Sequence, residues 1–131
     1  MTDPCSLTSV TPNLMVADVA ATLDFYRRVL GFEAVMTVPD AAPFHWAMLR
    51  RDGVILMIQE RANLTAEYPL LAERQPGGGL TLFLKVSDVA ALFRAVEGQA
   101  DICAPLHDTF YGTREFALID CNGFILTFAE G

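Results

Sequence analysis

The sequence predicts an α+β fold built from two βαβββ repeats, which together contain eight strands. Two observations predict this fold. Two stretches of the chain repeat at one constant offset, and each copy shows the same order of helical and strand-like periodicity. The length of 131 residues and a hydrophobic content of 53% suit one domain with a full core.

The repeat is visible in the sequence itself. Residues 14–21, LMVADVAA, match residues 84–91, LKVSDVAA, at six of eight positions with an offset of 70. The same offset aligns 46–60 with 116–130 and makes Gly53 and Gly123 equivalent. Shared αβ patterning is the alternative explanation, but two separate stretches with one offset favour a true repeat. We therefore divide the single domain 1–131 into repeat 1 at about 9–60, a connector at 61–79 and repeat 2 at about 80–130.

Each element of the first repeat has a local signal. Asp18 is a good N-cap for a helix from Val19 to Leu30, and Gly31 is suited to end it. Asp52-Gly53 is a strong hairpin signal between two strand-like runs. The strands expected in this repeat are 10–16, 32–38, 44–50 and 54–60.

The second repeat shows the same order. Ser87 or Asp88 caps a helix over 89–97, Gly98 ends it, and Asn122-Gly123 marks the last turn. The strands expected here are 80–86, 101–106, 115–120 and 124–129. The connector contains a possible short helix at 64–74 before Pro76, and Gly77-Gly78-Gly79 is interpreted as a linker.

The length of the hairpin turns decides which side chains face the helices. A two-residue turn at Asp52-Gly53 would place His45 and Glu115 under the helices, where an imidazole or carboxylate is costly without a partner. A three-residue turn with glycine in the left-handed region instead buries four apolar side chains, Trp46, Met48, Phe116 and Leu118. We therefore expect the three-residue turn. The side chains then facing the cleft are His45, Ala47, Leu49, Glu115, Ala117 and Ile119.

Strand alternation predicts an apolar groove with a few polar groups, which is typical of a small-molecule site. Methionine side chains would let this groove adapt to a flat or aromatic ligand. The residues expected to contact the ligand are Thr11, Asn13, Met15, His45, Leu49, Ile55, Met57, Gln59, Thr81, Phe83, Lys85, Tyr111, Arg114, Glu115 and Thr127.

Composition narrows the classes of partner. The net charge of −7 argues against nucleic acid and anionic membranes and favours a cationic ligand. No apolar run is long enough for a membrane span, and the N-terminus lacks the pattern of a signal peptide. Cys5, Cys103 and Cys121 form no CxxC motif and are expected to be reduced, inert thiols. We expect a cytoplasmic protein.

The segments VADVAATLDFYRRVLGFE and YGTREFALIDCNGFILTFAEG, together with the two βαβββ units, closely resemble the vicinal oxygen chelate superfamily. This superfamily includes glyoxalase I, extradiol dioxygenases, fosfomycin-modifying enzymes and bleomycin resistance proteins. The C-terminal segment is most similar to the bleomycin resistance branch. The resemblance implies that the two repeats form a curled eight-stranded mixed sheet around a cleft, with the helices outside. It also implies a homodimer and four metal-ligand positions at equivalent places in the two repeats.

Those four positions are Thr11, Met57, Thr81 and Thr127 in this sequence. Metal enzymes of the superfamily carry His, Gln or Glu there, because a divalent ion needs charged or strongly polar donors. Threonine hydroxyls and a thioether do not meet that need. We therefore expect no metal, no cofactor and none of the family's metal chemistry. His45 and Glu115 are equivalent under the repeat, but two ligands would make a poor site.

The sequence leaves three functions open. The first is a metal-independent binding protein similar to bleomycin resistance proteins, which sequesters a drug or metabolite. The second is a lyase, isomerase, transferase or dioxygenase-like enzyme of the superfamily without the usual metal, with His45 or Glu115 as general base. The third is a homodimer with a vestigial cleft.

Two smaller questions also stay open. His107 lies beside Asp108 in a loop, where it is either solvated or functional. Arg114 and Glu115 match a motif of the resembled family, as a structural ion pair or as ligand contacts.

Overall fold

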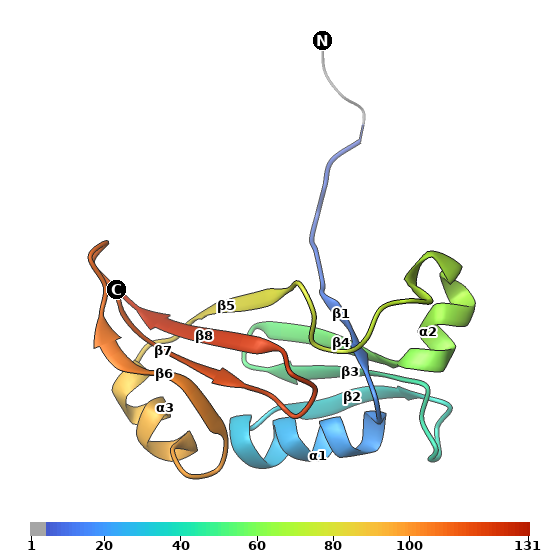
Figure 1. Cartoon of the computed structure of the whole chain (residues 1–131), viewed down its shortest axis with the longest axis horizontal. Coiled ribbons are helices and arrows are strands. Elements are labelled where there is room, and N and C mark those ends of the chain that lie inside the picture. The colour runs from blue at the N-terminus through green and yellow to red at the C-terminus, as the bar shows by residue number, and fades with distance from the viewer. Residues whose placement is uncertain (1–4) are drawn as a thin grey trace.

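The computed structural model describes residues 5–131 and confirms the α+β class and the βαβββ order of each repeat (Figure 1). Repeat 1 forms module 1, which contains four strands and one helix, and repeat 2 forms module 2 in the same order. Module 1 comprises β1 (Asn13–Val16), α1 (Val19–Leu30), β2 (Glu33–Val38), β3 (Trp46–Arg51) and β4 (Val54–Glu60). The connector holds α2 (Arg61–Glu67) and the short 3₁₀ helix η1 (Pro69–Leu71). Module 2 comprises β5 (Thr81–Lys85), α3 (Val89–Val96), β6 (Asp101–Asp108), β7 (Arg114–Ile119) and β8 (Ile125–Glu130).

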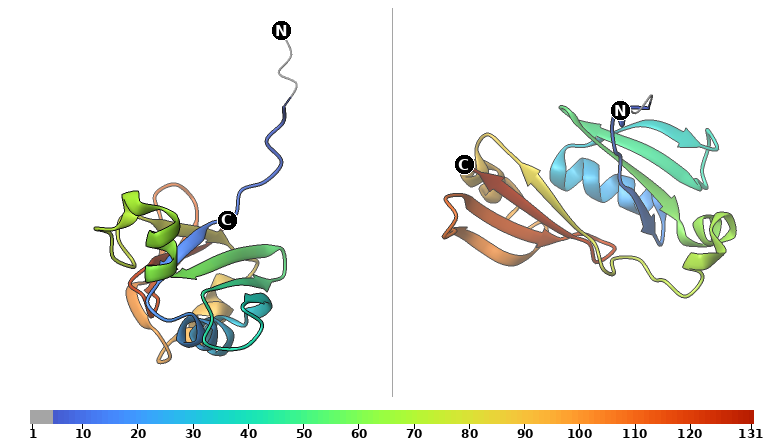
Figure 2. Two further views of the ribbon diagram at one scale, coloured as in Figure 1. Left: turned by 90° about the vertical axis from the view of Figure 1, so that its right-hand side faces the viewer. Right: turned by 90° about the horizontal axis from the view of Figure 1, so that it is seen from above.

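The eight strands are divided between two four-stranded sheets. Sheet A has the order β1-β4-β3-β2 and sheet B the order β5-β8-β7-β6. In each sheet the first strand is parallel to the last, and the other pairs are antiparallel. The two sheets lie beside one another, with α1 and α3 on the same side of them (Figures 1 and 2). The expected curled sheet is therefore present as two sheets that do not close on each other.

Capping fixes where the two long helices begin and end. The Asp18 carboxylate accepts a hydrogen bond from the Ala21 amide, and Asp88 does the same for Ala91. Gly31 ends α1 with a positive φ of 70°. This left-handed conformation is less favourable for residues that carry a Cβ than for glycine. The boundaries predicted for α1 are confirmed. In the connector, by contrast, the helix begins at Arg61 rather than at residue 64.

One hydrophobic cluster lies between the helices and the sheets and contains residues of both modules. Tyr26 packs edge-to-face against Phe25 and Phe32, and Phe116 stacks against Phe128. The side of each sheet that faces this cluster is called its helix face, and the other side its open face. No helix in the described part of the chain is long and apolar enough to cross a membrane.

The β7–β8 turn, residues 120–124, joins module 2 to module 1. The Tyr26 hydroxyl of α1 donates to Asp120 Oδ2 at 2.5 Å, and both side chains are buried. Asp120 Oδ1 accepts from the amides of Asn122 and Phe124, which holds the turn in shape. Asn122 in turn accepts from the Ala17 amide at 3.0 Å. These hydrogen bonds fix the turn against α1 and against Ala17, which precedes the helix cap.

The connector crosses the same turn at a glycine. Gly77 has a φ of +87°, and a Cβ at this position would lie 2.4 Å from the carbonyl oxygen of Asn122. Such a contact is impossible without moving one of the two backbones. The three-glycine segment is therefore more than a flexible linker, because its first residue permits a close approach between backbones.

The turn length expected from the sequence is right in module 2 and wrong in module 1. Asp120 bonds to Phe124 across a three-residue loop, so Phe116 and Leu118 lie in the core. In module 1, Arg51 pairs with Val54 across a two-residue loop in which Asp52 has a φ of 51°. The one-residue difference reverses the faces of β3. Ala47 and Leu49 are buried under α1, whereas Trp46 and Met48 lie on the open face.

Replacing Tyr26 by Phe tests the link between the modules. The change leaves Asp120 Oδ2 buried without its hydrogen-bond donor, which costs about 1–3 kcal/mol of unfolding free energy. Urea unfolding of Tyr26→Phe should show this loss, while Tyr68→Phe, at an exposed tyrosine, should unfold like the wild type. Equal stability of Tyr26→Phe and wild type would contradict the proposed role of this hydrogen bond.

The glycine pair Gly77 and Gly78 offers a matched test of the backbone approach. Gly77→Ala should lower the unfolding midpoint by several degrees, because its Cβ collides with backbone and its φ is unfavourable for alanine. Gly78→Ala should not, because its nearest neighbour is 4.0 Å away. Thermal unfolding followed by circular dichroism measures both, and similar midpoints for the two variants would contradict this account.

Candidate functional site

The open face of sheet A is apolar and rich in methionine. It includes the tryptophan of the chain, Trp46, which is half-buried, and Met36 and Ile55, which are exposed. Strand pairing places eleven side chains on this face: Asn13, Met15, Glu33, Met36, Val38, Trp46, Met48, Arg50, Ile55, Met57 and Gln59.

The open face of sheet B is more polar. Phe83 and Ile125 are exposed on it, while the small side chains of Ala117 and Ala129 are buried between their neighbours. Strand pairing places twelve side chains here: Thr81, Phe83, Lys85, Asp101, Ala104, His107, Glu115, Ala117, Ile119, Ile125, Thr127 and Ala129.

The structure brings ten of the fifteen predicted ligand residues onto these open faces. Those on sheet A are Asn13, Met15, Ile55, Met57 and Gln59, and those on sheet B are Thr81, Phe83, Lys85, Glu115 and Thr127. Thr11 lies just before β1, and Tyr111 lies in the β6–β7 loop. Sequence reasoning missed Trp46 and Met48, although the Asp52-Gly53 pair is a signal for the two-residue turn that exposes them.

Three predicted ligand residues lie elsewhere. Leu49 is only 1% exposed and belongs to the core, so its assignment to the ligand site is wrong. His45 is exposed just before β3, and strand alternation places it on the same side as Ala47. It therefore does not face Glu115 across a cleft. Arg114 lies on the helix face of β7, where it pairs with Glu130 rather than with an open-face residue.

Three threonines and one methionine occupy the four positions at which metal enzymes of the resembled family carry their ligands. Thr11 and Met57 lie close together, since the Met57 amide donates to the adjacent Pro12 carbonyl. Thr81 and Thr127 lie on neighbouring strands of sheet B. Hydroxyl and thioether groups do not fit a divalent ion at this place. Within residues 5–131, no three His, Cys, Asp or Glu side chains are grouped so that they could hold a metal.

Gln59 is tied to α2 by its own hydrogen bonds. Its amide nitrogen donates to Asn63 at 2.7 Å and to Glu67 at 2.9 Å, and its oxygen accepts from Asn13 at 2.9 Å. Because both donor hydrogens are used, Gln59 anchors the connector to β4. Met15 beside it is buried under the connector and lines a groove of about 710 Å³ between the connector and β1.

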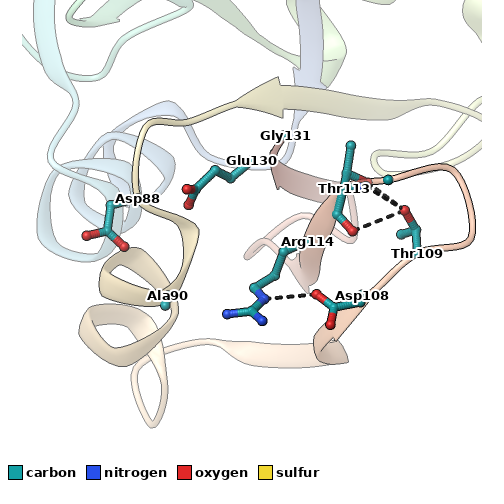
Figure 3. Close-up of a pocket in the computed structure, with 9 residues that line it drawn as sticks. Asp88, Ala90, Asp108, Thr109, Thr113, Arg114, Glu130 and Gly131 are labelled. Carbon is teal, nitrogen blue, oxygen red and sulfur yellow. Dashed lines mark hydrogen bonds and ion pairs between the residues drawn. The ribbon is translucent and has the colours of Figure 1, made fainter.

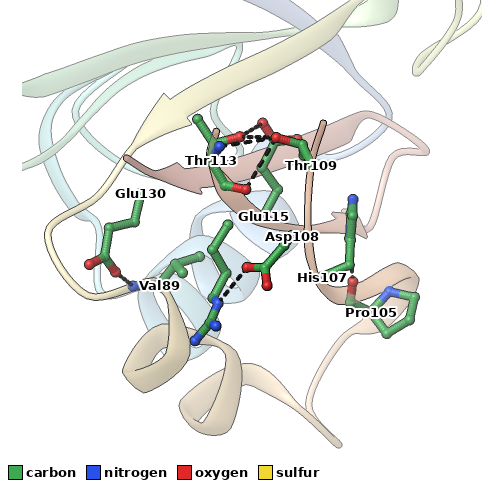
Figure 4. A network of polar contacts seen from close by, with 9 residues as sticks. Val89, Pro105, His107, Asp108, Thr109, Thr113, Glu115 and Glu130 are labelled. Atoms are coloured by element: carbon green, nitrogen blue, oxygen red, sulfur yellow. Dashed lines mark hydrogen bonds and ion pairs between the residues drawn. The ribbon is translucent and has the colours of Figure 1, made fainter. Parts of the chain in front are cut away.

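Glu115 is a buried carboxylate at the start of β7 (Figure 4). It is 5% exposed, and its Oε2 accepts hydrogen bonds from Tyr111 at 2.8 Å and Thr113 at 2.7 Å. The hydrogen bond to Glu115 is the main cause that raises the pKa of Tyr111, so this hydroxyl stays a proton donor at neutral pH. Thr113 is held in place by Thr109, whose hydroxyl lies 2.7 Å from its own.

A small polar pocket of about 470 Å³ lies at the helix-face end of the same strands (Figure 3). The Arg114 guanidinium forms an ion pair with Asp108 at 3.0 Å, which raises the pKa of Arg114 and lowers that of Asp108. Glu130 accepts from the Val89 amide and so caps α3. The charged groups of this pocket are therefore already engaged within the protein.

His107 and Cys121 show no sign of catalysis. His107 is exposed on β6, and its Nδ1 donates to the Pro105 carbonyl at 2.7 Å. Partial burial raises the pKa of the Cys121 thiol, which reduces its thiolate fraction at neutral pH. Cys103 is exposed on the edge strand β6.

Residues 7–128 match the Glyoxalase/Bleomycin resistance protein/Dioxygenase superfamily. The chain belongs to this superfamily. It is 31% identical to an uncharacterised protein of Mycobacterium bovis over 121 residues, which cover 88% of this chain and 78% of the relative.

Two solved structures are also similar. TioX from Micromonospora sp. ML1 has a TM-score of 0.74 and 27% identity, covering 95% of this chain and 96% of TioX. A bleomycin-binding protein complexed with bleomycin has a TM-score of 0.69 and 23% identity, covering 95% of this chain and 99% of that protein. The latter likeness concerns the fold, because its identity is low.

Replacing Glu115 by Gln should leave the fold intact. The amide oxygen can still accept from Tyr111 and Thr113, and the cost of burying a charge without a cation disappears. We expect an unfolding free energy within about 1 kcal/mol of wild type, or higher, in urea unfolding at pH 7. A loss of more than about 2 kcal/mol would show that the charge itself supports the fold.

Proposed function

We propose that this member of the superfamily is a metal-independent binding protein that sequesters a small organic molecule on its open faces. The observation that carries the proposal is the open face of sheet A. Trp46 and three methionines, Met36, Met48 and Met57, lie on this side of the sheet, opposite α1, and Met36 is 56% exposed. Large apolar side chains on an uncovered face are typical of a binding surface.

The donor chemistry supports binding without a metal. Thr11, Met57, Thr81 and Thr127 offer no charged ligand at the positions where metal enzymes of the superfamily hold their ion. Tryptophan and methionine instead suit a flat or aromatic compound, which they contact through dispersion and sulfur–aromatic interactions. The similar bleomycin-binding protein gives a precedent in this fold for an organic ligand.

We also propose that the protein acts in the cytoplasm as a homodimer and that one outcome of sequestration is resistance to an antibiotic. In one chain the two open faces belong to separate sheets that share no hydrogen-bonded strands. A second copy would bring an open face opposite another and turn two exposed surfaces into enclosed clefts. An enclosed cleft removes more of the ligand's surface from water and so increases affinity.

A thermal-shift screen of metal-stripped protein tests the proposed function. Bleomycin-type drugs and planar aromatic antibiotics form one arm, and Ni²⁺, Zn²⁺ and Mn²⁺ the other. A ligand at about 100 times its Kd should stabilise the fold by roughly 2.7 kcal/mol. Stabilisation by a drug, with the drug recovered chemically unchanged, supports sequestration. Stabilisation by the metals alone, or turnover of the drug, would contradict it.

Trp46 provides an internal reporter for the same binding event. A ligand that stacks on the open face of sheet A should change the fluorescence of this tryptophan, which is the only one in the chain. Trp46→Leu should weaken binding about tenfold or more, because the stacking surface is lost. The control is Leu70→Ala, at a fully exposed leucine in the connector, which should bind as wild type does. Unchanged affinity of Trp46→Leu would place the ligand elsewhere.

A further inference from the structure

A row of side chains crosses the open face of sheet B at one level. Strand pairing aligns His107 with Glu115, Glu115 with Ala129, and Ala129 with Lys85. Glu115 and Lys85 are therefore two strands apart, roughly 10 Å between their Cα atoms. The row presents a carboxylate near one side of the sheet and an ammonium at the other.

Neither charge of this row is neutralised within residues 5–131. The ion pairs of the described chain involve other residues, and none includes Glu115 or Lys85. The hydroxyls of Tyr111 and Thr113 both donate hydrogen bonds to the same oxygen of the Glu115 carboxylate, Oε2. Oε1 accepts no hydrogen bond from the described residues and is not sealed from solvent. One lone-pair site of a nine-tenths buried carboxylate is therefore available to a ligand.

Small side chains lie between the two charged residues of the row. Ala129 is 0% exposed and Ala117 is 6% exposed, so larger neighbouring side chains cover both. Phe83 lies two residues before Lys85 on the same face and is 58% exposed. A ligand that spans the two charges would therefore cross β8 over the side chains that cover Ala129, with an apolar group against Phe83.

The equivalent row of sheet A shows that the fold does not require these charges. Met15 pairs with Gln59 and Gln59 with Trp46, so the positions of Lys85 and Glu115 are taken by Met15 and Trp46. The same backbone is thus built there without an ionised side chain. Because burying a carboxylate without a cation is unfavourable, the buried charge of Glu115 needs an explanation other than folding, whereas Lys85 is exposed.

We propose that the open face of sheet B binds a zwitterionic small molecule, whose ammonium group is held by Glu115 and whose carboxylate is held by Lys85. The ligand class is that of amino-acid-derived or short peptidic compounds with a separated amine and acid. The inference rests on the proposed function and specifies the ligand chemistry of that site. The Tyr111 ring, fixed beside the carboxylate by its hydroxyl, adds a π surface that favours a cation.

Calorimetric titration with the tripeptide Gly-Phe-Gly tests the inference, using the free peptide, its N-acetylated form and its C-amidated form. Wild-type protein should bind the free peptide at least tenfold more tightly than either blocked form, because each block removes a charge-assisted contact. Glu115→Gln should bind the free and acetylated peptides equally. Lys85→Met should bind the free and amidated peptides equally. Arg114→Gln, which removes a charge from the helix face of the same sheet, should behave as wild type.

The outcomes separate this inference from the proposed function. Equal affinity of the three peptides for wild type, or full retention of selectivity in both Glu115→Gln and Lys85→Met, would overturn the zwitterion site. If an aromatic antibiotic binds and changes Trp46 fluorescence while no peptide binds, sequestration stands and the zwitterion site is wrong. If neither kind of compound binds, both proposals fail.

Discussion

The arrangement of the two modules depends on the β7–β8 turn, where a buried carboxylate holds a turn and a helix together. Asp120 uses one oxygen to shape its own turn and the other to accept the hydroxyl of Tyr26 in α1. Burial and the neighbouring carboxylate raise the pKa of Tyr26, so the donor keeps its proton. Gly77 lets the connector pass over the same turn. The long helices α1 and α3 are thereby kept on one side of the sheets, and on the other side the connector with α2 covers only part of sheet A (Figure 2).

The two modules share the same order of strands and helix but carry different side chains on their open faces. Sheet A presents Trp46 and methionines, whereas the equivalent row of sheet B presents Glu115, Ala129 and Lys85. Helix-face positions remain apolar in both, because they share one core. Open-face positions are free of that constraint, so a repeat can diverge there without loss of the fold. This division supports the assignment of ligand binding to the open faces.

Much of the fold was predictable, because the offset of 70 and the caps at Asp18 and Asp88 are local signals. The side of the sheet that each β3 residue faces was not predictable. The β3–β4 turn is one residue shorter than expected, so Trp46 lies on the open face and Leu49 in the core. Larger apolar side chains are usually buried, but Trp46 and Met48 lie on the open face while the smaller Ala47 is buried. The contacts of Tyr26 with Asp120 and of Gly77 with Asn122 link distant segments, which no local pattern reveals.

The most direct test of the central claim is a ¹⁵N NMR titration with a compound that stabilises the protein. Ligand binding on the open faces predicts the largest amide shift changes in β3, β4, β7 and β8, at residues such as Met48, Met57 and Ala117. Shift changes confined to the polar pocket near Asp88 and Glu130, or to the groove beneath the connector, would contradict the account.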